Sequence, residues 1–375
     1  MLIGQYFKNL DPKFYNHYFS SLTFSSKQCK KNSIFFSIKG TNQNGNKFIN
    51  EAINKGARTI VSNKKFEGFK KKVLYLRSKN VRKLLAETAY KVFNKKPKHL
   101  TAVTGTNGKS SIANFYFQIL KLSKIKSASI GTLGIQTNSK NIFASNTTLD
   151  PVQLSRQLQK LKEKKVDHVI LEASSHGLKQ NRLDGLKFNT AIFTNLSHDH
   201  LDYHKNFSDY LNSKLYLFQK LLKKKSVIIT DSSIPEYKKI KKISKQKRLN
   251  LKTILNSGST ISLLSHRYLG EKQIIKIKYK NLIYTLSLKL IGKIQIKNIL
   301  MAMLAAESKI LKFRKIVNKV SQIKPVKGRL EKIGIIKNNA IVILDYAHTP
   351  EALNICLENI KDQFGERKIS VVFGC

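Results

Sequence analysis

The segment Gly105–Ser111 reads Gly-Thr-Asn-Gly-Lys-Ser-Ser and combines the residue types that bind a nucleotide phosphate. Glycines let backbone N–H groups turn toward an anion, and a following helix adds the positive end of its dipole. Lys109 contributes a point charge, and Ser110 contributes the hydroxyl that usually reaches Mg²⁺. The general P-loop pattern requires glycine where this chain has Val103. The shorter pattern Gly-Thr-Asn-Gly-Lys-Ser therefore indicates a phosphate loop only in a suitable structural setting. An apolar run before the segment and a helical pattern from Ile112 provide the setting that a phosphate loop needs.

Glu172 is a candidate metal ligand because it ends a predicted apolar strand, Val166–Leu171. A buried carboxylate is costly unless a cation compensates its charge, and Mg²⁺ is a cation that carboxylate oxygens bind well. Taken alone, a glutamate at the end of a strand is more often a solvated loop residue. The neighbouring phosphate loop favours the metal interpretation.

The segment Asn195–His204 holds three histidines and two aspartates, in a chain that has nine histidines. Such a cluster is typical of a metal-dependent hydrolase, but that function needs further ligands and leaves Lys109 without a role. We therefore expect His200 to be a nitrogen ligand of a second Mg²⁺. His198 and His204 are expected to make hydrogen bonds within the loop.

Lys214 lies fourteen residues beyond His200, in a helical pattern that begins near Ser208. In a chain with 70 basic residues, a lysine is by default a solvated surface charge. Nothing in the neighbouring sequence distinguishes Lys214 from that default. A chemical role for this lysine therefore depends on resemblance to known proteins.

The chain carries a formal net charge of +48, because Lys and Arg outnumber Asp and Glu by 70 to 22. An excess of this size is typical of nucleic-acid-binding proteins when it is concentrated on one arm or face. Here lysines occur in every segment, and the sequence contains no nucleic-acid-binding motif. This distribution indicates a general compositional bias toward lysine at surface positions. We expect no specific nucleic-acid partner, although nonspecific binding at low salt and attraction of nucleotides follow from the charge.

The composition indicates a globular protein, with 41% apolar residues in 375. That length predicts two or three domains. No run approaches the ~18 consecutive apolar residues of a membrane helix, and the N-terminus lacks the pattern of a signal peptide. The sequence therefore predicts a cytoplasmic monomer without membrane insertion. Cys29, Cys356 and Cys375 are expected to be free thiols, because three distant cysteines fit neither a disulfide framework nor a zinc ribbon.

Residues 1–96 predict a small N-terminal α/β domain, which ends at a polar, proline-containing stretch typical of a linker. Its expected strands and helices are Ile34–Ile38, Phe48–Lys55, Thr59–Val61, Val73–Leu76 and Val81–Phe93.

Residues 97–324 predict a central P-loop ATPase-type domain with a parallel sheet, because apolar strands alternate with helical patterns. Ligands gather at the carboxyl ends of the strands in such a sheet, where the sequence places the phosphate loop and Glu172. Between residues 253 and 290 the apolar pattern changes to period two, which predicts extra antiparallel strands on both sides of Lys280 and Asn281. A helix is expected to follow from Ile296 to Leu311.

Residues 325–375 predict the start of an incomplete Rossmann-like C-terminal domain. Its expected elements are a strand at Ile341–Leu344, a loop at Asp345–Pro350, a helix at Glu351–Ile360 and a strand at Ile369–Phe373. Roughly 50 residues cannot close a doubly wound core. We therefore expect the chain to be incomplete at its C-terminus.

Six separated motifs occur in an order and at a spacing that resembles the Mur ligase family. The similarity covers the first two predicted domains and the beginning of the third, and it is greatest to the UDP-N-acetylmuramoyl-tripeptide synthetases of that family. It implies a Mur ligase-like α/β fold. The motifs are Gly105–Ser111, Asn146–Asp150, Glu172–Arg182, Asn195–His204, Lys214 and Asp345–Pro350.

The resemblance implies two binding regions. The implied ATP site consists of Gly105, Thr106, Asn107, Gly108, Lys109, Ser110, Ser111, Asn298, Arg329, Asp345 and His348. The implied site for the UDP-N-acetylmuramoyl dipeptide consists of Phe24, Ser26, Thr41, Asn42 and Gln43 at the uridine diphosphate end, and of Asn146, Thr147, Thr148, Ser174, Gln180 and Arg182.

The resemblance also implies the catalytic and metal-binding residues. Lys109, Glu172, His200 and Lys214 are the implied catalytic residues, and Ser110, Glu172, His200 and Lys214 the implied Mg²⁺ ligands. In the family the lysine that matches Lys214 carries a CO₂-derived carbamate, as N6-carboxylysine. Chemistry agrees, because CO₂ adds only to a neutral amine, which desolvation favours.

The implied function is an ATP-dependent ligase that adds the third amino acid, meso-diaminopimelate or L-lysine, to UDP-N-acetylmuramoyl-L-alanyl-D-glutamate through an acyl phosphate. The sequence does not decide between these two diamino acids. It departs from the family pattern at Ser25, Lys27, Leu149 and Gln295. Two alternatives stay open: a ligase similar to folylpolyglutamate synthase, and a nucleotide-binding fragment without ligase activity.

Overall fold

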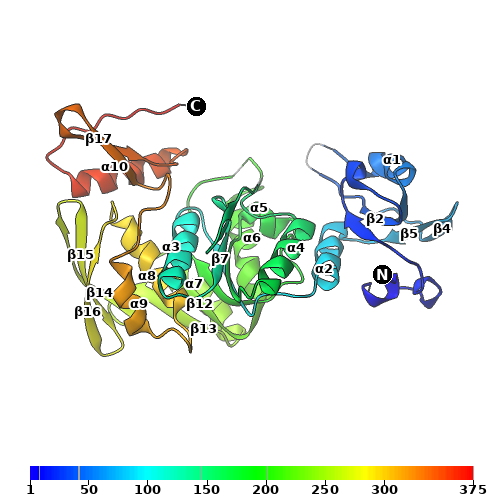
Figure 1. Ribbon diagram of the computed structural model, residues 1–375, viewed down its shortest axis with the longest axis horizontal. Helices are drawn as coiled ribbons and strands as arrows, with labels where there is room; N and C mark the ends of the chain where they lie inside the picture. The colour runs from blue at the N-terminus through cyan, green and yellow to red at the C-terminus, as the bar shows by residue number, and fades with distance from the viewer. Residues whose placement is uncertain (8, 41–42, 145, 201, 375) are drawn as a thin grey trace. The chain divides into compact units, whose positions relative to one another are not determined.

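The computed structural model describes residues 1–7, 9–40, 43–144, 146–200 and 202–374, which form two compact units (Figure 1). The predicted α/β class is confirmed in both units. The predicted domain boundaries at residues 96 and 324 stay a prediction. The smaller unit comprises Met1–Pro97, Leu149–Lys165 and Gly177–Leu186, and the larger unit comprises Lys98–Thr148, Val166–His176 and Lys187–Cys375.

The smaller unit contains a five-stranded sheet in the order β1-β2-β3-β5-β4, parallel except for the pairing of β4 with β5. Phe35 and Phe36 are neighbours on β2 and are both buried, and they belong to different apolar clusters because successive strand residues point to opposite faces. The strands are β1 (Ser21–Thr23), β2 (Ser33–Phe36), β3 (Ala57–Ser62), β4 (Gly68–Lys70) and β5 (Val73–Arg77). The helices are η1 (Ile3–Gln5), η2 (Pro12–Phe14), η3 (Ser26–Gln28), η4 (Gly45–Phe48), α1 (Ile49–Asn54), α2 (Val81–Val92) and α4 (Pro151–Glu163).

Helix α4 packs with the N-terminal elements although it is distant from them in sequence. Asp150 caps the helix by accepting hydrogen bonds from the N–H groups of Val152 and Gln153, at 2.9 and 3.0 Å, and Pro151 occupies the first helical position. Val152 then joins the apolar cluster that contains Leu85 of α2. This placement depends on tertiary packing, which local sequence patterns do not encode.

The larger unit contains an eleven-stranded sheet in the order β16-β15-β14-β13-β12-β11-β6-β10-β7-β8-β9. The strands from β14 to β7 in that order are parallel, and antiparallel pairings extend both ends. The predicted period-two strands around Lys280 are confirmed. The strands are β6 (His99–Thr104), β7 (Ser127–Gly131), β8 (Gly134–Thr137), β9 (Asn141–Ile142), β10 (His168–Glu172), β11 (Phe188–Phe193), β12 (Leu222–Asp231), β13 (Asn250–Leu255), β14 (Ile261–Leu269), β15 (Lys272–Tyr279) and β16 (Leu282–Leu288).

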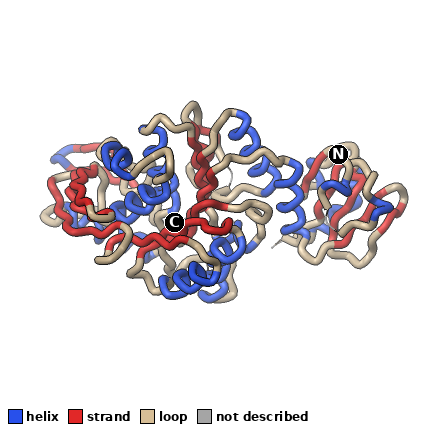
Figure 2. Tube along the Cα trace, turned by 90° about the horizontal axis from the view of Figure 1, so that it is seen from below, coloured by secondary structure: helices blue, strands red, loops and turns tan. Residues whose placement is uncertain are grey.

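Helices cover both faces of this sheet (Figure 2). Helices α3 (Lys109–Leu122) and α8 (Ile294–Ala306) pack against each other, and α9 (Phe313–Val320) extends the same core. Ile229 of β12 belongs to that core, so Ile228 faces the opposite side, where α6 (Phe207–Lys220) and α7 (Tyr237–Gln246) contact the strand. The short helix α5 (Ser175–Lys179) follows β10. Within the described residues, no helix has the length and apolarity needed to cross a membrane.

The last part of the chain forms the hairpin β17 (Glu331–Ile336) and β18 (Ala340–Leu344), with η5 (Lys337–Asn339) between them, followed by α10 (Pro350–Gln363). Ile291, Leu330 and Cys356 form its buried cluster. The predicted strand Ile369–Phe373 is wrong: its residues form no ladder within the described chain, and Val372 is 99% exposed. An apolar run alone does not make a strand when no neighbouring strand accepts its hydrogen bonds. Cys29 and Cys356 are free thiols, and Cys375 lies outside the described residues.

Candidate active site

The phosphate loop lies between the end of β6 and the beginning of α3. Gly105 has φ +146°, and a Cβ at this position would lie 1.8 Å from Oγ1 of Thr194. Gly108 has φ +86°, and a Cβ there would lie 2.6 Å from Oδ1 of Asn298. Both positions therefore require glycine, for backbone conformation and for space.

The end of β11 holds this loop in place. The N–H of Asn107 donates to Oδ1 of Asn195 at 2.9 Å, and the Thr194 hydroxyl donates to the Asn107 carbonyl at 2.7 Å. The Ser197 N–H donates to Oγ1 of Thr106 at 3.0 Å. The loop is thus fixed in one shape by its own neighbours, as preorganised anion binding requires.

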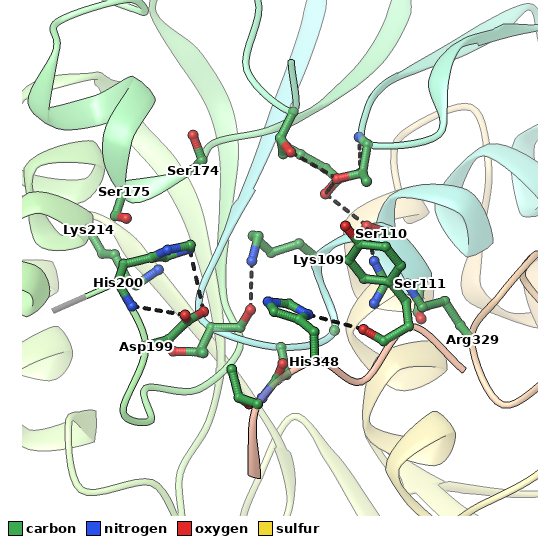
Figure 3. A pocket seen from close by; sticks show the side chains of 18 residues that line it. Lys109, Ser110, Ser111, Ser174, Ser175, Asp199, His200, Lys214, Arg329 and His348 are labelled. Atoms are coloured by element: carbon green, nitrogen blue, oxygen red, sulfur yellow. Dashed lines mark hydrogen bonds and ion pairs between the residues drawn. The ribbon is translucent and has the colours of Figure 1, made fainter. Parts of the chain in front are cut away.

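A pocket of about 220 Å³ opens over the loop, and all four residues predicted for catalysis line it (Figure 3). It lies at the carboxyl ends of the parallel strands, as predicted. Of the residues predicted for ATP binding, Gly105, Asn298 and Asp345 are not among its lining residues. The pocket is lined by Thr106, Asn107, Gly108, Lys109, Ser110, Ser111, Thr132, Thr147, Glu172, Ser174, Ser175, Asp199, His200, Lys214, Arg329, Tyr346, His348 and Thr349.

Glu172 is buried at the end of β10, with 2% of its surface exposed. Its carboxylate accepts hydrogen bonds from the Ser110 hydroxyl at 2.9 Å, and from the N–H and the hydroxyl of Thr132 at 2.9 and 3.2 Å. Burial raises the pKa of the Glu172 carboxyl, and the charge of Lys109 opposes that rise. The carboxylate also packs on Gly131, where a Cβ would lie only 2.1 Å from Oε1.

Lys109 begins α3 and is partly buried. Its Nζ donates to the carbonyl oxygens of Gly105 at 3.0 Å and Thr106 at 2.6 Å. Burial lowers the pKa of this amine, whereas the charge of Glu172 opposes the change. The structure thus brings a lysine, a hydroxyl and a carboxylate together around the phosphate loop.

Lys214 is buried in α6, with 1% of its surface exposed, so it is not the solvated charge that its sequence context suggests. Its Nζ donates to the Gly105 carbonyl at 2.8 Å and lies 4.3 Å from the ring centroid of Tyr210. Burial lowers the pKa of the Lys214 amine well below its ordinary value, and the nearby charge of Lys109 lowers it further.

His200 has a positive φ of +54° and contacts Asp199, with Nε2 lying 3.4 Å from Oδ2. Burial lowers its pKa, and the negative charge of Asp199 opposes that effect. The ring of His176 lies edge-on to it, with centroids 4.8 Å apart. His204 is buried, and its Nδ1 lies 3.5 Å from Oδ2 of Asp209, within the loop and the start of α6.

The C-terminal part of the chain supplies the other wall of the pocket. The Arg329 guanidinium lies 4.7 Å from the Tyr346 ring centroid, and its Nη2 lies 3.5 Å from the Ser110 hydroxyl. The Asp345 carboxylate accepts hydrogen bonds from the N–H groups of Leu330 and Ala347, both at 2.8 Å. Asp345 therefore shapes the loop that presents His348 and Tyr346 to the pocket.

Three predicted substrate residues of the larger unit lie next to Glu172. The Thr148 hydroxyl donates to the Glu172 carbonyl at 2.8 Å and lies 3.0 Å from Oγ of Ser174. The Thr147 hydroxyl lies 3.0 Å from that of Thr132. Thr147 and Ser174 line the pocket, whereas Thr148 is buried and fixes the turn behind them.

The other predicted substrate residues belong to the smaller unit, except Asn146. Phe24 is 42% exposed, and the buried Ser26 donates its hydroxyl to Oε2 of Glu51 at 2.8 Å. Oε1 of Gln180 accepts from Nη2 of Arg182 at 2.8 Å. The backbone carbonyl of Gln43 accepts from the Gly40 N–H at 2.8 Å, and Thr41 and Asn42 lie outside the described residues.

The donor set beside the loop fits Mg²⁺ in part. The Ser110 hydroxyl and the Glu172 carboxylate are hard oxygen donors that already contact each other in the pocket. Within the described residues, no three His, Cys, Asp or Glu side chains converge as a metal-binding group. In this structure the Lys214 amine contacts a backbone carbonyl and His200 contacts Asp199.

Sequence reasoning missed several residues of the site. Thr132 and Gly131 shape the environment of Glu172, and a Gly-Thr pair at the end of a strand was the available signal. Tyr210 contacts both Lys214 and the loop, one helical turn before the lysine. Ser175 has a buried hydroxyl for which the described chain provides no hydrogen-bond partner. Asp199 lies in the histidine-rich segment, for which the sequence predicted only His200 as a ligand.

A phosphate loop and a buried carboxylate at the strand ends define a nucleotide-dependent enzyme, and comparisons with known proteins identify its family. Residues 103–306 match the family model of the Mur ligase middle domain, and residues 328–375 match that of the Mur ligase, glutamate ligase domain. The chain belongs to the Mur ligase family, whose members use ATP to form amide bonds. The predicted family is thereby confirmed.

Two relatives carry the name UDP-N-acetylmuramoyl-L-alanyl-D-glutamate--2,6-diaminopimelate ligase. The protein of that name from Rickettsia typhi is 37% identical over 375 residues, which cover 98% of this chain and 74% of the relative. The protein from Agrobacterium fabrum is 33% identical and covers 94% of this chain and 72% of the relative. The chain thus spans about three quarters of the length of these relatives.

Solved structures agree with this assignment. A structure of a ligase with the same name superposes with a TM-score of 0.81 at 25% identity, covering 95% of this chain and 73% of that one. Mycobacterium tuberculosis folylpolyglutamate synthase superposes with a TM-score of 0.62 at 15% identity, covering 74% of this chain and 69% of the other. The second similarity shows a shared fold and nothing more.

Proposed function

We propose that this chain is an ATP-dependent ligase that adds 2,6-diaminopimelate to UDP-N-acetylmuramoyl-L-alanyl-D-glutamate. The observation that carries the proposal is the pocket in which Lys109, Ser110 and Glu172 meet at the phosphate loop, in a chain with 37% identity to a ligase of that name. The identity supports diaminopimelate over lysine, because the relatives are named for the former.

In the proposed reaction, the loop N–H groups and Lys109 hold the β- and γ-phosphates of ATP. The D-glutamyl carboxylate attacks the γ-phosphate, which gives an acyl phosphate and ADP, and the amine of the incoming amino acid then displaces phosphate. Mg²⁺, when bound through Ser110 and Glu172, would supply positive charge to the phosphate oxygens. The fixed positive groups of the loop stabilise the charge that develops on the transferring phosphoryl group.

We further propose that Lys214 carries a carbamate and, with His200, binds a second Mg²⁺. The supporting observation is the burial of the amine, which favours the neutral form that CO₂ requires. A carbamate would convert a buried amine into a carboxylate, which a divalent cation stabilises. The contact of Lys214 with the Gly105 carbonyl supports a position for this group beside the phosphate loop.

The remaining predicted residues keep their proposed roles in binding. For ATP, we propose Gly105 to Ser111, with Asn298 beside Gly108, and Arg329, Asp345 and His348 from the C-terminal part. For the muramoyl dipeptide, we propose Asn146, Thr147, Thr148, Ser174, Gln180 and Arg182. For the uridine diphosphate end, we propose Phe24, Ser26 and residues 41–43.

We also propose that the enzyme acts as a cytoplasmic monomer. ATP is a cytoplasmic metabolite, which supports this location. Sedimentation of the purified protein at micromolar concentration tests this proposal. A stable dimer would contradict it.

The test of the ligase activity is product formation from UDP-N-acetylmuramoyl-L-alanyl-D-glutamate and ATP with either diamino acid, followed by mass spectrometry and phosphate release. We expect a UDP-tripeptide with meso-diaminopimelate and much less with L-lysine. Product with folate and glutamate instead would support the folylpolyglutamate synthase alternative. Tight ATP binding without any turnover would support a nucleotide-binding protein without ligase activity.

A further inference from the structure

Tyr210 is a fully buried tyrosine of α6 that the proposed reaction leaves without a role. It lies one helical turn before Lys214, so the two side chains share one face of the helix. Its ring centroid is 4.3 Å from Nζ of Lys214, and its hydroxyl lies 3.0 Å from Oγ1 of Thr106 in the phosphate loop. One side chain thus contacts both the buried lysine and the loop.

The Lys214 amine is enclosed by these same elements. It donates to the Gly105 carbonyl at 2.8 Å, and the Tyr210 ring covers a second side. Lys214 also lines the pocket, so the pocket provides the open approach to the amine. A four-carbon side chain has several free rotations, and it keeps one position only if its surroundings restrict them.

The hydroxyl of Tyr210 extends this arrangement into the loop. Thr106 contacts Tyr210 through Oγ1, and the same atom accepts the Ser197 N–H at 3.0 Å. The adjacent Gly105 accepts from Lys109 as well as from Lys214. Displacement of Tyr210 would therefore alter both the loop and the direction of the Lys214 amine.

We propose that Tyr210 is a positioning residue: its ring directs Lys214 into the pocket, and its hydroxyl fixes the phosphate loop at Thr106. The inference about the ring rests on the proposed ligase function, because it concerns the carbamate of Lys214. The inference about the hydroxyl concerns nucleotide binding alone. The ring thus acts on Lys214 and the hydroxyl on nucleotide binding, and substitutions of Tyr210 can test these two roles separately.

Tyr210→Phe keeps the ring and removes the hydroxyl. Loss of one buried hydrogen bond weakens ATP binding by about fivefold, which calorimetry measures directly, while kcat stays within about twofold because Lys214 keeps its ring contact. Tyr210→Leu removes both contacts. It lowers kcat by about tenfold or more and raises the bicarbonate concentration needed for half-maximal activity, which the Phe variant does not.

The matched control is Tyr116→Phe. Tyr116 is a buried tyrosine of α3 whose hydroxyl bonds to Thr101, and it does not line the pocket. Its variant should lose stability to a similar extent and keep both ATP affinity and bicarbonate dependence. Thr106→Val should weaken ATP binding, and combining it with Tyr210→Phe should add little, because both remove the same hydrogen bond.

Two results would overturn the proposal. Unchanged ATP affinity in Tyr210→Phe would show that the hydroxyl does not fix the phosphate loop. Equal bicarbonate dependence in the Phe and Leu variants would show that the ring does not direct Lys214. If Tyr210→Leu does not fold, Tyr210→Phe against Tyr116→Phe still decides the first point. If the wild-type protein forms no UDP-tripeptide, the proposed function fails, yet the ATP affinities still test the hydroxyl.

Discussion

Strands β6 and β10 pair along their length and carry ionisable residues at both ends, but the two ends differ in what surrounds those residues. At the amino end, His99 pairs with His168 in the register and their rings stack with centroids 4.5 Å apart. At the carboxyl end, Glu172 is paired with Val103, next to the phosphate loop. Burial lowers the pKa of His168 to about 4 and raises that of Glu172.

Both ends thus hold groups with shifted pKa values, so a shifted pKa by itself does not locate an active site. At the carboxyl end the backbone is adapted to its side chains, because Gly105, Gly108 and Gly131 lie where a Cβ would collide with a neighbour. A cavity opens there, and a lysine and a hydroxyl face the carboxylate. The histidine pair lines no part of that pocket. We propose that the carboxyl end carries the chemistry, and we assign no catalytic role to the amino end.

The largest expected effect is that of Lys109→Ala. This change removes the positive charge that we propose to bind the phosphates, so turnover should fall by more than about 10²- to 10³-fold. Phosphate release measures it, and a melting temperature close to that of the wild type is the control. If the variant keeps a tenth of the wild-type activity, the proposal that the carboxyl end of the sheet carries the chemistry is contradicted.

Lys214→Ala should be inactive for a different reason, because it removes the proposed carbamate. Short carboxylates such as acetate should restore part of the activity by replacing the missing carboxylate group. Rescue is measured as phosphate release against carboxylate concentration, with Lys109→Ala as a variant that carboxylates should not restore. Full activity of Lys214→Ala without any additive would refute the carbamate.

Gly131→Ala tests whether the backbone is adapted to Glu172. The new methyl group would lie 2.1 Å from Oε1 if nothing moved, so the carboxylate must shift. Overpacking of this kind costs about 1–3 kcal/mol, and the Mg²⁺ concentration for half-maximal activity should rise about tenfold. Gly334→Ala is the matched control, because no atom lies within 4 Å of its added Cβ. Equal Mg²⁺ requirements in both variants would contradict the account.

His168 should affect stability and leave turnover unchanged. Its pKa is about 4 in the folded chain and 6.5 ordinarily, so the unfolded chain binds more protons between these values. The free energy of unfolding therefore stays high above pH 6.5 and falls by about 1–3 kcal/mol as the pH drops toward 4. His168→Phe should remove most of this pH dependence in urea titrations at pH 4.5 and 7.5. A loss of activity at pH 8 in this variant would give the amino end a role that we do not assign to it.

The sequence predicted the phosphate loop and the parallel sheet well, because both depend on local patterns. Glycine spacing, an apolar strand before it and a helix after it define Gly105 to Ser111, and alternating apolar runs define the sheet. Period two between residues 253 and 290 likewise predicted the antiparallel strands. Glu172 was predictable because a carboxylate directly after a buried strand is costly without a partner.

Contacts between distant segments could not be predicted in the same way. The burial of Lys214 depends on the packing of α6 against the loop, and in a lysine-rich chain its type carries no signal. The grouping of α4 with the N-terminal unit depends on Val152 and its partners in α2. The predicted strand Ile369–Phe373 failed because a strand requires a neighbour, and a local pattern does not specify one.

The proposed acyl phosphate can be tested by following the oxygen atoms of the substrate. UDP-N-acetylmuramoyl-L-alanyl-D-glutamate is prepared with ¹⁸O in the D-glutamyl carboxylate that forms the amide, and phosphate released with ATP and meso-diaminopimelate is analysed by mass spectrometry. Because phosphate leaves with the oxygen that joined it to the acyl group, the account predicts one ¹⁸O atom in each phosphate. Phosphate without ¹⁸O, released together with the UDP-tripeptide, would contradict it.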